Sequence, residues 1–162
     1  MGTRGRFAHR TALVTGAGGD IGATVAVRLA AEGARVVLAD VGGSLDTTAQ
    51  VCAAACPDIE PIVMRFDVTS EDEVRHAFGA LDASGVVVDL LVNNAGIQGA
   101  FCNVVDQEVS DLRRVLDVNV AGAFLVLREF ARALRGAGRP GAVVNTASMA
   151  QGGAPNMAGY SA

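Results

Sequence analysis

A glycine-rich segment at residues 15–22 is the first part of the chain whose composition could serve chemistry. It follows a short apolar run and precedes apolar residues at helical spacing, so we expect it to join a strand to a helix. Small residues let a backbone approach a pyrophosphate, and the start of a helix offers unpaired N–H groups. The segment departs from the G-x-G-x-x-G pattern, because Ile21 stands where glycine is required. A tight connection without a ligand is the alternative interpretation.

Asp40 is the second candidate, 18 residues after Gly22 at the end of the next apolar run. A carboxylate at this place can bind both ribose hydroxyls of an adenosine and would repel a 2′-phosphate. No Lys or Arg lies within residues 16–22 to bind such a phosphate. Both features favour NAD over NADP. The alternative is a turn residue at the end of a strand, which is a common role for Asp.

Polar residues also follow the third and fourth apolar runs. The pair Asp67 and Val68 could meet the adenine edge, and residues 93–96 place two amides and a glycine near the same cofactor. Adjacent Asn residues after a buried strand are costly unless their hydrogen bonds are used. Asn119 raises the same problem between two valines of a long helix. It could be a satisfied structural amide, but its position suggests a role in the site.

Alternating strands and helices must position these residues. The patterns predict strands at residues 12–15, 35–39, 61–67, 86–92 and 142–145, and helices at residues 21–31, 44–56, 70–82 and 111–135. Ser70 and Glu73 form the pattern of a capping box at the third helix. Strands joined through helices are parallel, so the chain is expected to be an α/β protein with a Rossmann-like, doubly wound sheet. Ligands of such sheets bind at the carboxyl ends of the strands.

The composition is that of one soluble domain. The 162 residues are 51% apolar and 19% charged, with a mean hydropathy of +0.36, which is typical of a globular chain. The net charge of −4 and the absence of a basic stripe argue against a nucleic acid partner. No stretch approaches the roughly 18 apolar residues of a membrane span, and the N-terminus lacks the apolar centre of a signal peptide.

The cysteines and histidines predict neither disulfides nor a metal site. Cys52, Cys56 and Cys102 form no C-x-x-C pair, so reduced thiols in a cytoplasmic protein are the simplest interpretation. His9 and His76 have no Cys or acid at ligand spacing and are expected to face solvent or to pack. A phosphotransferase of the P-loop class is excluded, because no Gly-Lys-Ser/Thr follows the glycine-rich turn.

Taken together, these residues resemble the N-terminal portion of the short-chain dehydrogenase/reductase family. The family's T-G-x-x-x-G-x-G turn corresponds to residues 15–22, its N-N-A-G motif to residues 93–96, and its tyrosine to Tyr160, the single tyrosine of the chain. The resemblance implies that the cofactor is bound by Gly16, Asp20, Ile21, Gly22, Asp40, Asp67, Val68, Asn94, Ala95 and Gly96, and that the catalytic residues are Asn119, Ser148 and Tyr160. It also implies the strand order 3-2-1-4-5, followed by two further strands.

The resemblance implies an NAD-dependent oxidoreductase that acts on a small secondary alcohol or ketone and forms a homo-oligomer at full length. In that family Tyr160 would transfer a proton and Ser148 would hold the substrate oxygen. A Lys four residues after the tyrosine binds the nicotinamide ribose, and Asn119 would help to place it through a water. An unperturbed phenol has a pKa of about 10 and is a poor base at neutral pH, so a nearby cation that stabilises the phenolate is needed.

Three departures from the family pattern modify this expectation. Asp20 replaces the middle glycine of the turn, where its carboxylate could cap the helix or weaken cofactor binding. The spacing from Ser148 to Tyr160 is one residue shorter than the family pattern. The sequence ends at Ala162, before the Lys position.

We therefore expect residues 1–162 to be an incomplete NAD-binding Rossmann domain, truncated after the fifth strand, of an enzyme of about 250 residues. The fifth strand would then be an exposed apolar edge, and the chain alone would be catalytically incomplete. A non-catalytic nucleotide-binding fragment is the alternative. A methyltransferase is disfavoured by residues 93–96 and by the pair Ser148 and Tyr160.

Overall fold

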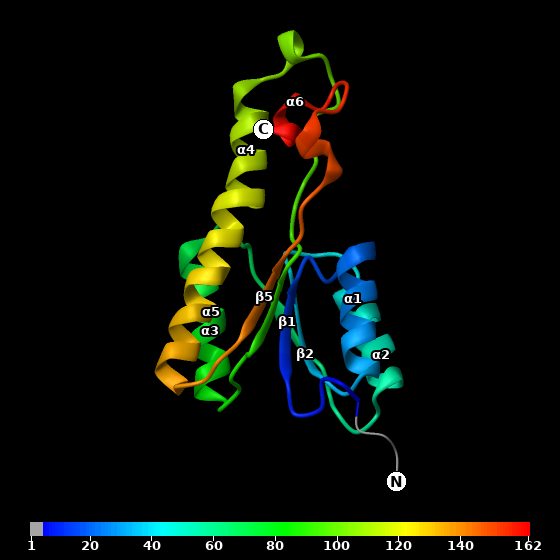
Figure 1. The fold of residues 1–162 in the computed structure, drawn as a ribbon, viewed down its shortest axis with the longest axis vertical. Helices are drawn as coiled ribbons and strands as arrows, with labels where there is room; N and C mark the ends of the chain where they lie inside the picture. The colour runs from blue at the N-terminus through cyan, green and yellow to red at the C-terminus, as the bar shows by residue number, and fades with distance from the viewer. Residues whose placement is uncertain (1–4) are drawn as a thin grey trace.

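Five parallel strands form one sheet in the order β3-β2-β1-β4-β5 (Figure 1). The computed structural model describes residues 5–162, so residues 1–4 of the predicted domain lie outside the described residues. The strands are β1 (Thr11–Thr15), β2 (Arg35–Asp40), β3 (Ile62–Arg65), β4 (Leu90–Asn93) and β5 (Ala142–Asn145). The order confirms the Rossmann-like parallel sheet and places the reversal of winding between β1 and β4, where ligands of this architecture bind.

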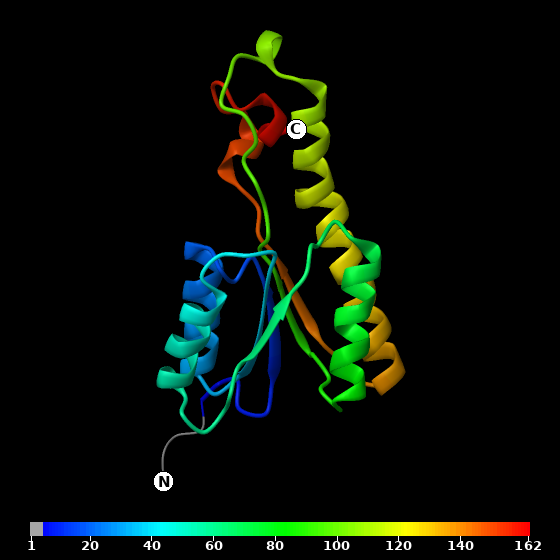
Figure 2. The same cartoon turned by 180° about the vertical axis from the view of Figure 1, so that it is seen from behind.

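Helices cover both faces of the sheet. They are α1 (Asp20–Ala31), α2 (Leu45–Ala55), α3 (Glu71–Ala83), α4 (Val109–Leu116), α5 (Ala123–Ala137) and the short α6 (Ala158–Ser161), with 3-10 turns at Val104–Asp106 and Met149–Gly152. The pair α1 and α2 lies on one face, and α3 and α5 lie on the other (Figures 1 and 2). The strand β5 is the edge of the sheet, and all four of its residues are exposed, as expected from the sequence.

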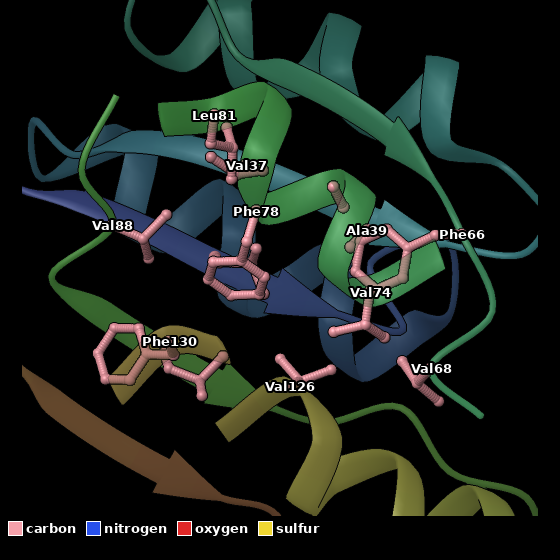
Figure 3. Packing of buried hydrophobic residues seen from close by; sticks show 13 residues of the cluster. Val37, Ala39, Phe66, Val68, Val74, Phe78, Leu81, Val88, Val126 and Phe130 are labelled. Carbon is pink, nitrogen blue, oxygen red and sulfur yellow. The ribbon is translucent and has the colours of Figure 1, made fainter. Parts of the chain in front are cut away.

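The larger apolar core lies between the sheet and the helices α3 and α5 (Figure 3). Val74, Phe78 and Leu81 recur at helical spacing on α3, and Val126 and Phe130 do so on α5. These side chains meet apolar residues of the strands, and each full burial of a Val, Leu or Phe side chain contributes about 1.5–3 kcal/mol. The core therefore holds the strand ends rigidly in place beneath the polar residues that follow them.

The start of α3 shows half of the predicted capping box. The Ser70 hydroxyl accepts the Glu73 N–H at 3.3 Å, as the pattern predicts. The reciprocal bond is absent among the described residues, because the Glu73 carboxylate accepts the Asp67 N–H at 2.8 Å and the Ser70 N–H donates to the Asp67 carbonyl. The prediction of a complete box is therefore wrong, and Glu73 ties the end of the third strand segment to the helix instead.

The long helix predicted at residues 111–135 begins at Val109 and is not uniform. A π-helical turn, Asp117–Gly122, lies between α4 and α5. Such turns insert an extra residue into a helix and free backbone groups, and they are frequent at functional sites. The predicted apolar face is not continuous either, since Leu116, Val120 and Phe124 are exposed whereas Val126 and Phe130 are buried.

The fourth strand is shorter than predicted, because ladder pairing starts at Leu90 and not at residue 86. Val88 and Asp89 are nevertheless buried. The Asp89 carboxylate is 0% exposed and accepts from the Thr11 N–H at 3.1 Å, from Arg139 at 2.7 Å and from Arg10 at 3.3 Å. A buried charge is stable only with such partners. This network joins the segments at the starts of β1, β4 and β5.

Candidate functional site

The turn between β1 and α1 can be built only from glycine at two places. Gly16 has a φ of +67°, and a side chain there would lie 2.9 Å from the Asn94 amide nitrogen. At Gly22 a Cβ would lie 2.1 Å from the Gly16 carbonyl oxygen. The backbone is therefore closely packed on its inner side and leaves the opposite side open to a ligand.

Asp20 is the first residue of α1, and its side chain is exposed. The N-cap is Gly19, and no side-chain hydrogen bond caps the helix. The expectation that the Asp20 carboxylate caps α1 is therefore wrong, because a residue at the first helical position cannot reach the N–H groups of its own first turn as an N-cap can. Asp20 lines the cavity at the helix start.

The carboxylate of Asp40 is fixed against this turn by two backbone donors. Its Oδ2 accepts the Gly18 N–H at 3.0 Å, and its Oδ1 accepts the Gly42 N–H at 3.3 Å. An ionised carboxylate offers about four acceptor positions, so further donors such as ribose hydroxyls can still bind. Asp40 thus both shapes the turn and keeps free acceptor capacity toward the cavity.

A cavity of about 370 Å³ collects most of the residues predicted to bind the cofactor. Its lining residues are Gly16, Gly19, Asp20, Ile21, Gly22, Asp40, Asn94 and Gly96. Neither Lys nor Arg is among these residues, and two of them are carboxylates. The cavity therefore offers hydrogen-bond acceptors and the N-terminus of α1, and it offers no cation for an additional phosphate.

Asp67 and Val68 do not line this cavity. The Asp67 carboxylate accepts the N–H and the hydroxyl of Thr69, both at 2.8 Å, and it borders a separate hollow that includes Ile97. Val68 is buried and packs where a Cβ on Gly122 would lie 2.7 Å from its Cγ2. The structure thus gives both residues a local packing or turn role and leaves their predicted contact with adenine as a prediction.

The two adjacent asparagines use their amides mainly within the protein. The Asn93 amide donates to the Ala123 carbonyl at 3.1 Å and to the Asn145 Oδ1 at 3.0 Å. The Asn94 amide donates to the Thr15 carbonyl at 3.1 Å. The Asn93 Oδ1 is the exception, since it is buried and has no hydrogen-bond partner among the described residues. The two amide nitrogens thus find their hydrogen-bond partners within the protein, as the sequence argument required. Asn94 thereby holds the glycine-rich turn.

Thr15, the first residue of the T-G-x-x-x-G-x-G turn, was not among the predicted site residues but joins two strand ends of the site. Its buried hydroxyl accepts the N–H groups of Asn94 and Ala95, each at 3.0 Å. These bonds join the carboxyl end of β1 to that of β4, at the reversal of winding. A polar β-branched residue at the last position of an apolar strand was the available signal.

Asn119 lies in the π-helical turn and binds the backbone of Ile97 at two points. Its Oδ1 accepts the Ile97 N–H at 2.8 Å, and its Nδ2 donates to the Ile97 carbonyl at 2.9 Å. The interpretation of a satisfied structural amide therefore describes its side chain. The residue also lies in the wall of a second cavity, so it shapes the site through the segment that follows β4.

This second cavity, of about 470 Å³, brings together all three predicted catalytic residues. Asn119 comes from the π-helical turn, Ser148 follows β5, and Tyr160 lies on α6. Ala95, Asn94 and Gly96 also line it, so Asn94 and Gly96 border both cavities. Two residues just past the end of β4 therefore belong to the walls of both cavities.

Ser148 is oriented by its own loop. Its hydroxyl oxygen accepts the Ala150 N–H at 3.1 Å, which starts the 3-10 turn Met149–Gly152. The hydroxyl hydrogen can rotate and donate to a ligand in the cavity. The segment between β5 and α6 thus contains this turn, which is not among the elements predicted from the sequence.

The comparison with protein families decides the identity of this arrangement. The family model described as short chain dehydrogenase matches residues 10–162. The chain belongs to the short chain dehydrogenase family. The chain is 35% identical over 159 residues to levodione reductase of Leifsonia aquatica, with 97% of the chain covered. The predicted family resemblance is confirmed, and an oxidoreductase is what the family supports.

Solved structures agree with this assignment. NAD+-bound xylitol dehydrogenase superposes with a TM-score of 0.89 at 41% identity and covers 96% of the chain. A structure from Agrobacterium tumefaciens with bound NADP superposes with a TM-score of 0.82 at 34% identity and covers 94%. The chain spans 59% of the length of each of these two and of levodione reductase. Both cofactors thus occur among the neighbours.

Among residues 5–162, no group of three or more His, Cys, Asp or Glu side chains could hold a metal ion. In the same range, no helix has the length and apolar character needed to cross a membrane. His9 and His76 are both exposed, which agrees with the solvent-facing role predicted for them.

Proposed function

We propose that this short chain dehydrogenase chain forms the NAD-binding and substrate-facing region of an oxidoreductase that transfers a hydride between a secondary alcohol or ketone and nicotinamide. The observation that carries the proposal is that Asn94 and Gly96 line both cavities. Asp40 lines one cavity, and Ser148 and Tyr160 line the other. A dinucleotide has two ends joined by a pyrophosphate, and the two cavities offer groups suited to each end.

The preference for NAD rests on Asp40. Its carboxylate is held beside the turn by Gly18 and Gly42 and is suited to accept hydrogen bonds from ribose hydroxyls. A 2′-phosphate in the same place would meet a negative charge and no cation, because the cavity is lined by neither Lys nor Arg. The NAD+ in the xylitol dehydrogenase neighbour supports the same choice.

The cavity fits a nicotinamide cofactor through its backbone. The close packing at Gly16 and Gly22 leaves room for phosphate beside the start of α1, whose N–H groups and dipole favour an anion. We infer that Gly16, Ile21, Gly22 and Gly96 hold the pyrophosphate and that Asp40 holds the adenosine ribose. When bound, the nicotinamide supplies hydride acceptance or donation.

The protein groups at the other end would manage the proton. The Ser148 hydroxyl can donate a hydrogen bond to the oxygen of an alcohol or ketone, and the Tyr160 phenol can accept or return the proton of that oxygen. Asn119 keeps the segment after β4 in place through Ile97. Asp67 and Val68 remain proposed contacts of the adenine end.

A nucleotide-binding chain without turnover is the second candidate, and one observation favours it. The chain contains no lysine, and neither Lys nor Arg lines the cavity of Tyr160. A phenol without a neighbouring cation is a weak base at neutral pH. We therefore propose that these 162 residues bind NAD but turn over an alcohol slowly or not at all.

Two further proposals concern the surroundings of the chain. An apolar strip formed by Leu116, Val120 and Phe124 is exposed along the helix from α4 to α5, and we propose that a second copy of the chain covers it in a homo-oligomer.

The three cysteines are free thiols, which supports a cytoplasmic location.

Titration with NADH and with NADPH tests the cofactor proposal. We expect saturable NADH binding, followed by nicotinamide fluorescence and by a rise in the unfolding temperature, and NADPH binding at least about ten-fold weaker. Asp40→Asn keeps the shape of the side chain but removes its charge, so it should reduce the difference in affinity between NADH and NADPH. Asp46→Asn, an exposed carboxylate on α2, is the matched control. A folded chain that binds neither nucleotide, or an unchanged preference in Asp40→Asn, would refute the proposal.

A further inference from the structure

Tyr160 lies on α6 (Ala158–Ser161) and lines the larger of the two cavities of the site. The contacts that α6 makes with the rest of the chain bear on where the Tyr160 ring lies. Figures 1 and 2 show α6 beside the upper end of α4, next to the segment that follows β4.

One side chain reaches the backbone of α6 directly. The Gly159 N–H donates to the Gln107 Oε1 at 3.0 Å, across 52 residues of sequence. Gly159 is buried, and a Cβ at that position would lie 2.2 Å from the Gln107 Nε2. The glycine next to Tyr160 thus allows the Gln107 amide to lie flat against the helix.

Asp111 fixes which way the Gln107 amide points. The Asp111 Oδ2 accepts the Gln107 Nε2 at 3.2 Å and the Ala100 N–H at 2.7 Å, and its Oδ1 accepts from Arg114 at 3.2 Å. The hydrogen bond from Ala100, assisted by that from Gln107, lowers the pKa of the Asp111 carboxyl below its usual value. A carboxylate can only accept, so the amide nitrogen of Gln107 must face Asp111 and its oxygen must face Gly159.

A backbone contact brings the same two segments together just before α6. The Cys102 N–H donates to the Asn156 carbonyl at 3.0 Å, and Cys102 forms an isolated parallel bridge with Met157. This contact sets the approach of the chain to α6 but ends two residues before Gly159. Gln107 provides the side-chain hydrogen bond to α6 itself.

We propose that Gln107, oriented by Asp111, is the positioning residue that holds Tyr160 at the cavity. The consequence for catalysis rests on the proposed function, in which Tyr160 transfers the proton. The contact itself does not rest on it and can be tested without nucleotide or substrate. Gln107 acts through the Gly159 backbone and does not line the cavity.

The chain offers a direct optical reporter, because Tyr160 is its single tyrosine and it has no tryptophan. We expect Gln107→Ala to raise the acrylamide quenching constant of Tyr160 emission by about two- to ten-fold, the change in a local opening equilibrium that loss of one hydrogen bond gives. Gln50→Ala, at an exposed position on α2, should leave it unchanged. Circular dichroism and the unfolding temperature show whether each variant is folded. Unchanged Tyr160 quenching in folded Gln107→Ala would overturn the proposal.

Gly159→Ala separates positioning from helix stability. Alanine favours a helix over glycine, so helix propensity alone would make Tyr160 less mobile. The added Cβ would instead displace Gln107, so we expect greater quenching in the wild-type background and little further change when Gln107 is already Ala. Lower quenching in Gly159→Ala would contradict the proposal.

Amide exchange in the unmodified chain provides a test that needs no variant. The Gly159 N–H should exchange more slowly than exposed amides of the loop before α6, by at least about ten-fold. Equal exchange rates would overturn the proposal even if every variant failed to fold. Absence of NADH binding, in contrast, would refute only the proposed function.

Discussion

Thr15 and Asn94 form a clip of two hydrogen bonds between the ends of β1 and β4, in which Asn94 is the donor of both. The Thr15 hydroxyl accepts the Asn94 N–H at 3.0 Å, and the Asn94 amide donates to the Thr15 carbonyl at 3.1 Å. The same hydroxyl accepts the Ala95 N–H at 3.0 Å. Because Asn94 also borders both cavities, this clip sets the distance between the glycine-rich turn and the cavity of Tyr160.

Thr15→Val tests the clip, since valine keeps the shape of threonine and removes the acceptor. Two N–H groups would lose their partner, so we expect a loss of about 1–3 kcal/mol in the free energy of unfolding by urea and weaker NADH binding. Thr24→Val is the control, because the Thr24 hydroxyl is exposed and donates only to the Asp20 carbonyl in its own helix. Its effect should stay within about 0.5 kcal/mol. Equal effects of the two substitutions would rule out a special role of Thr15.

Asp20→Asn should strengthen nucleotide binding while slightly weakening the fold. Asp20 lines the same cavity as Asp40, where a pyrophosphate would add negative charge. Removing one charge should lower the Kd of NADH by about three- to ten-fold at low salt, and less at high salt. The loss of an acid at the start of α1 should cost about 0.3–1 kcal/mol of stability.

The matched control is Asp72→Asn, which removes an acid from the first turn of α3. It should cost a similar amount of stability and leave the Kd of NADH unchanged. Adenosine, which has no phosphate, should bind wild type and Asp20→Asn equally. An unchanged NADH affinity in Asp20→Asn would show that this carboxylate lies too far from the bound phosphates to act on them.

Asp89→Ala should be strongly destabilising without a direct effect on the site. The substitution leaves Arg10 and Arg139 without their common carboxylate and the Thr11 N–H without its acceptor. Breaking a buried ion pair costs about 3–5 kcal/mol, which urea unfolding would measure. Both arginines are about half exposed and can turn to solvent, so a value at the lower end is expected. A change below about 1 kcal/mol would show that the network is not needed for the fold.

The hydrogen bonds of Glu32 predict that the protein loses part of its stability at acid pH. Hydrogen bonds from Arg6 and Arg28 lower the pKa of its carboxyl from 4.5 to about 2. A carboxyl with a lowered pKa contributes stability above its unfolded pKa, and this contribution is lost as the pH falls from about 4.5 to about 2. Glu32→Gln should therefore be less stable than wild type at pH 7, and the difference should shrink through this window. A difference that is independent of pH would contradict the assignment.

Much of the fold followed from the sequence, because each strand ends in a turn signal and each helix has a one-sided apolar face. The alternation forces parallel strands, so the ends carrying Thr15, Asp40 and Asn93 had to meet at one edge. One boundary was wrong, because the fourth strand begins at Leu90 and not at residue 86. The buried Asp89 before it is bound by Arg10 and Arg139, which lie far away in sequence and leave no local pattern.

The roles of the site residues were harder to predict than their positions at the ends of the strands. Asn94 and Asn119 were found because polar residues in apolar surroundings need partners. Their partners, Thr15 and the Ile97 backbone, depend on the path of loops that apolar periodicity does not encode. The same holds for Gln107, whose contact with Gly159 spans 52 residues and leaves no local pattern.

Energy transfer from Tyr160 to reduced nicotinamide tests the central claim, that one NAD site runs from Asp40 to Tyr160. Tyr160 is the only intrinsic emitter of its kind in the chain, so a loss of its emission on adding NADH, with sensitised nicotinamide emission, reports that the ring and the nicotinamide are adjacent. We expect saturable transfer with NADH, none with ADP-ribose, which lacks nicotinamide, and none in Tyr160→Phe. NADH that stabilises the chain against heat while Tyr160 emission stays unchanged would contradict the claim, because the nucleotide would then bind away from the cavity of Tyr160.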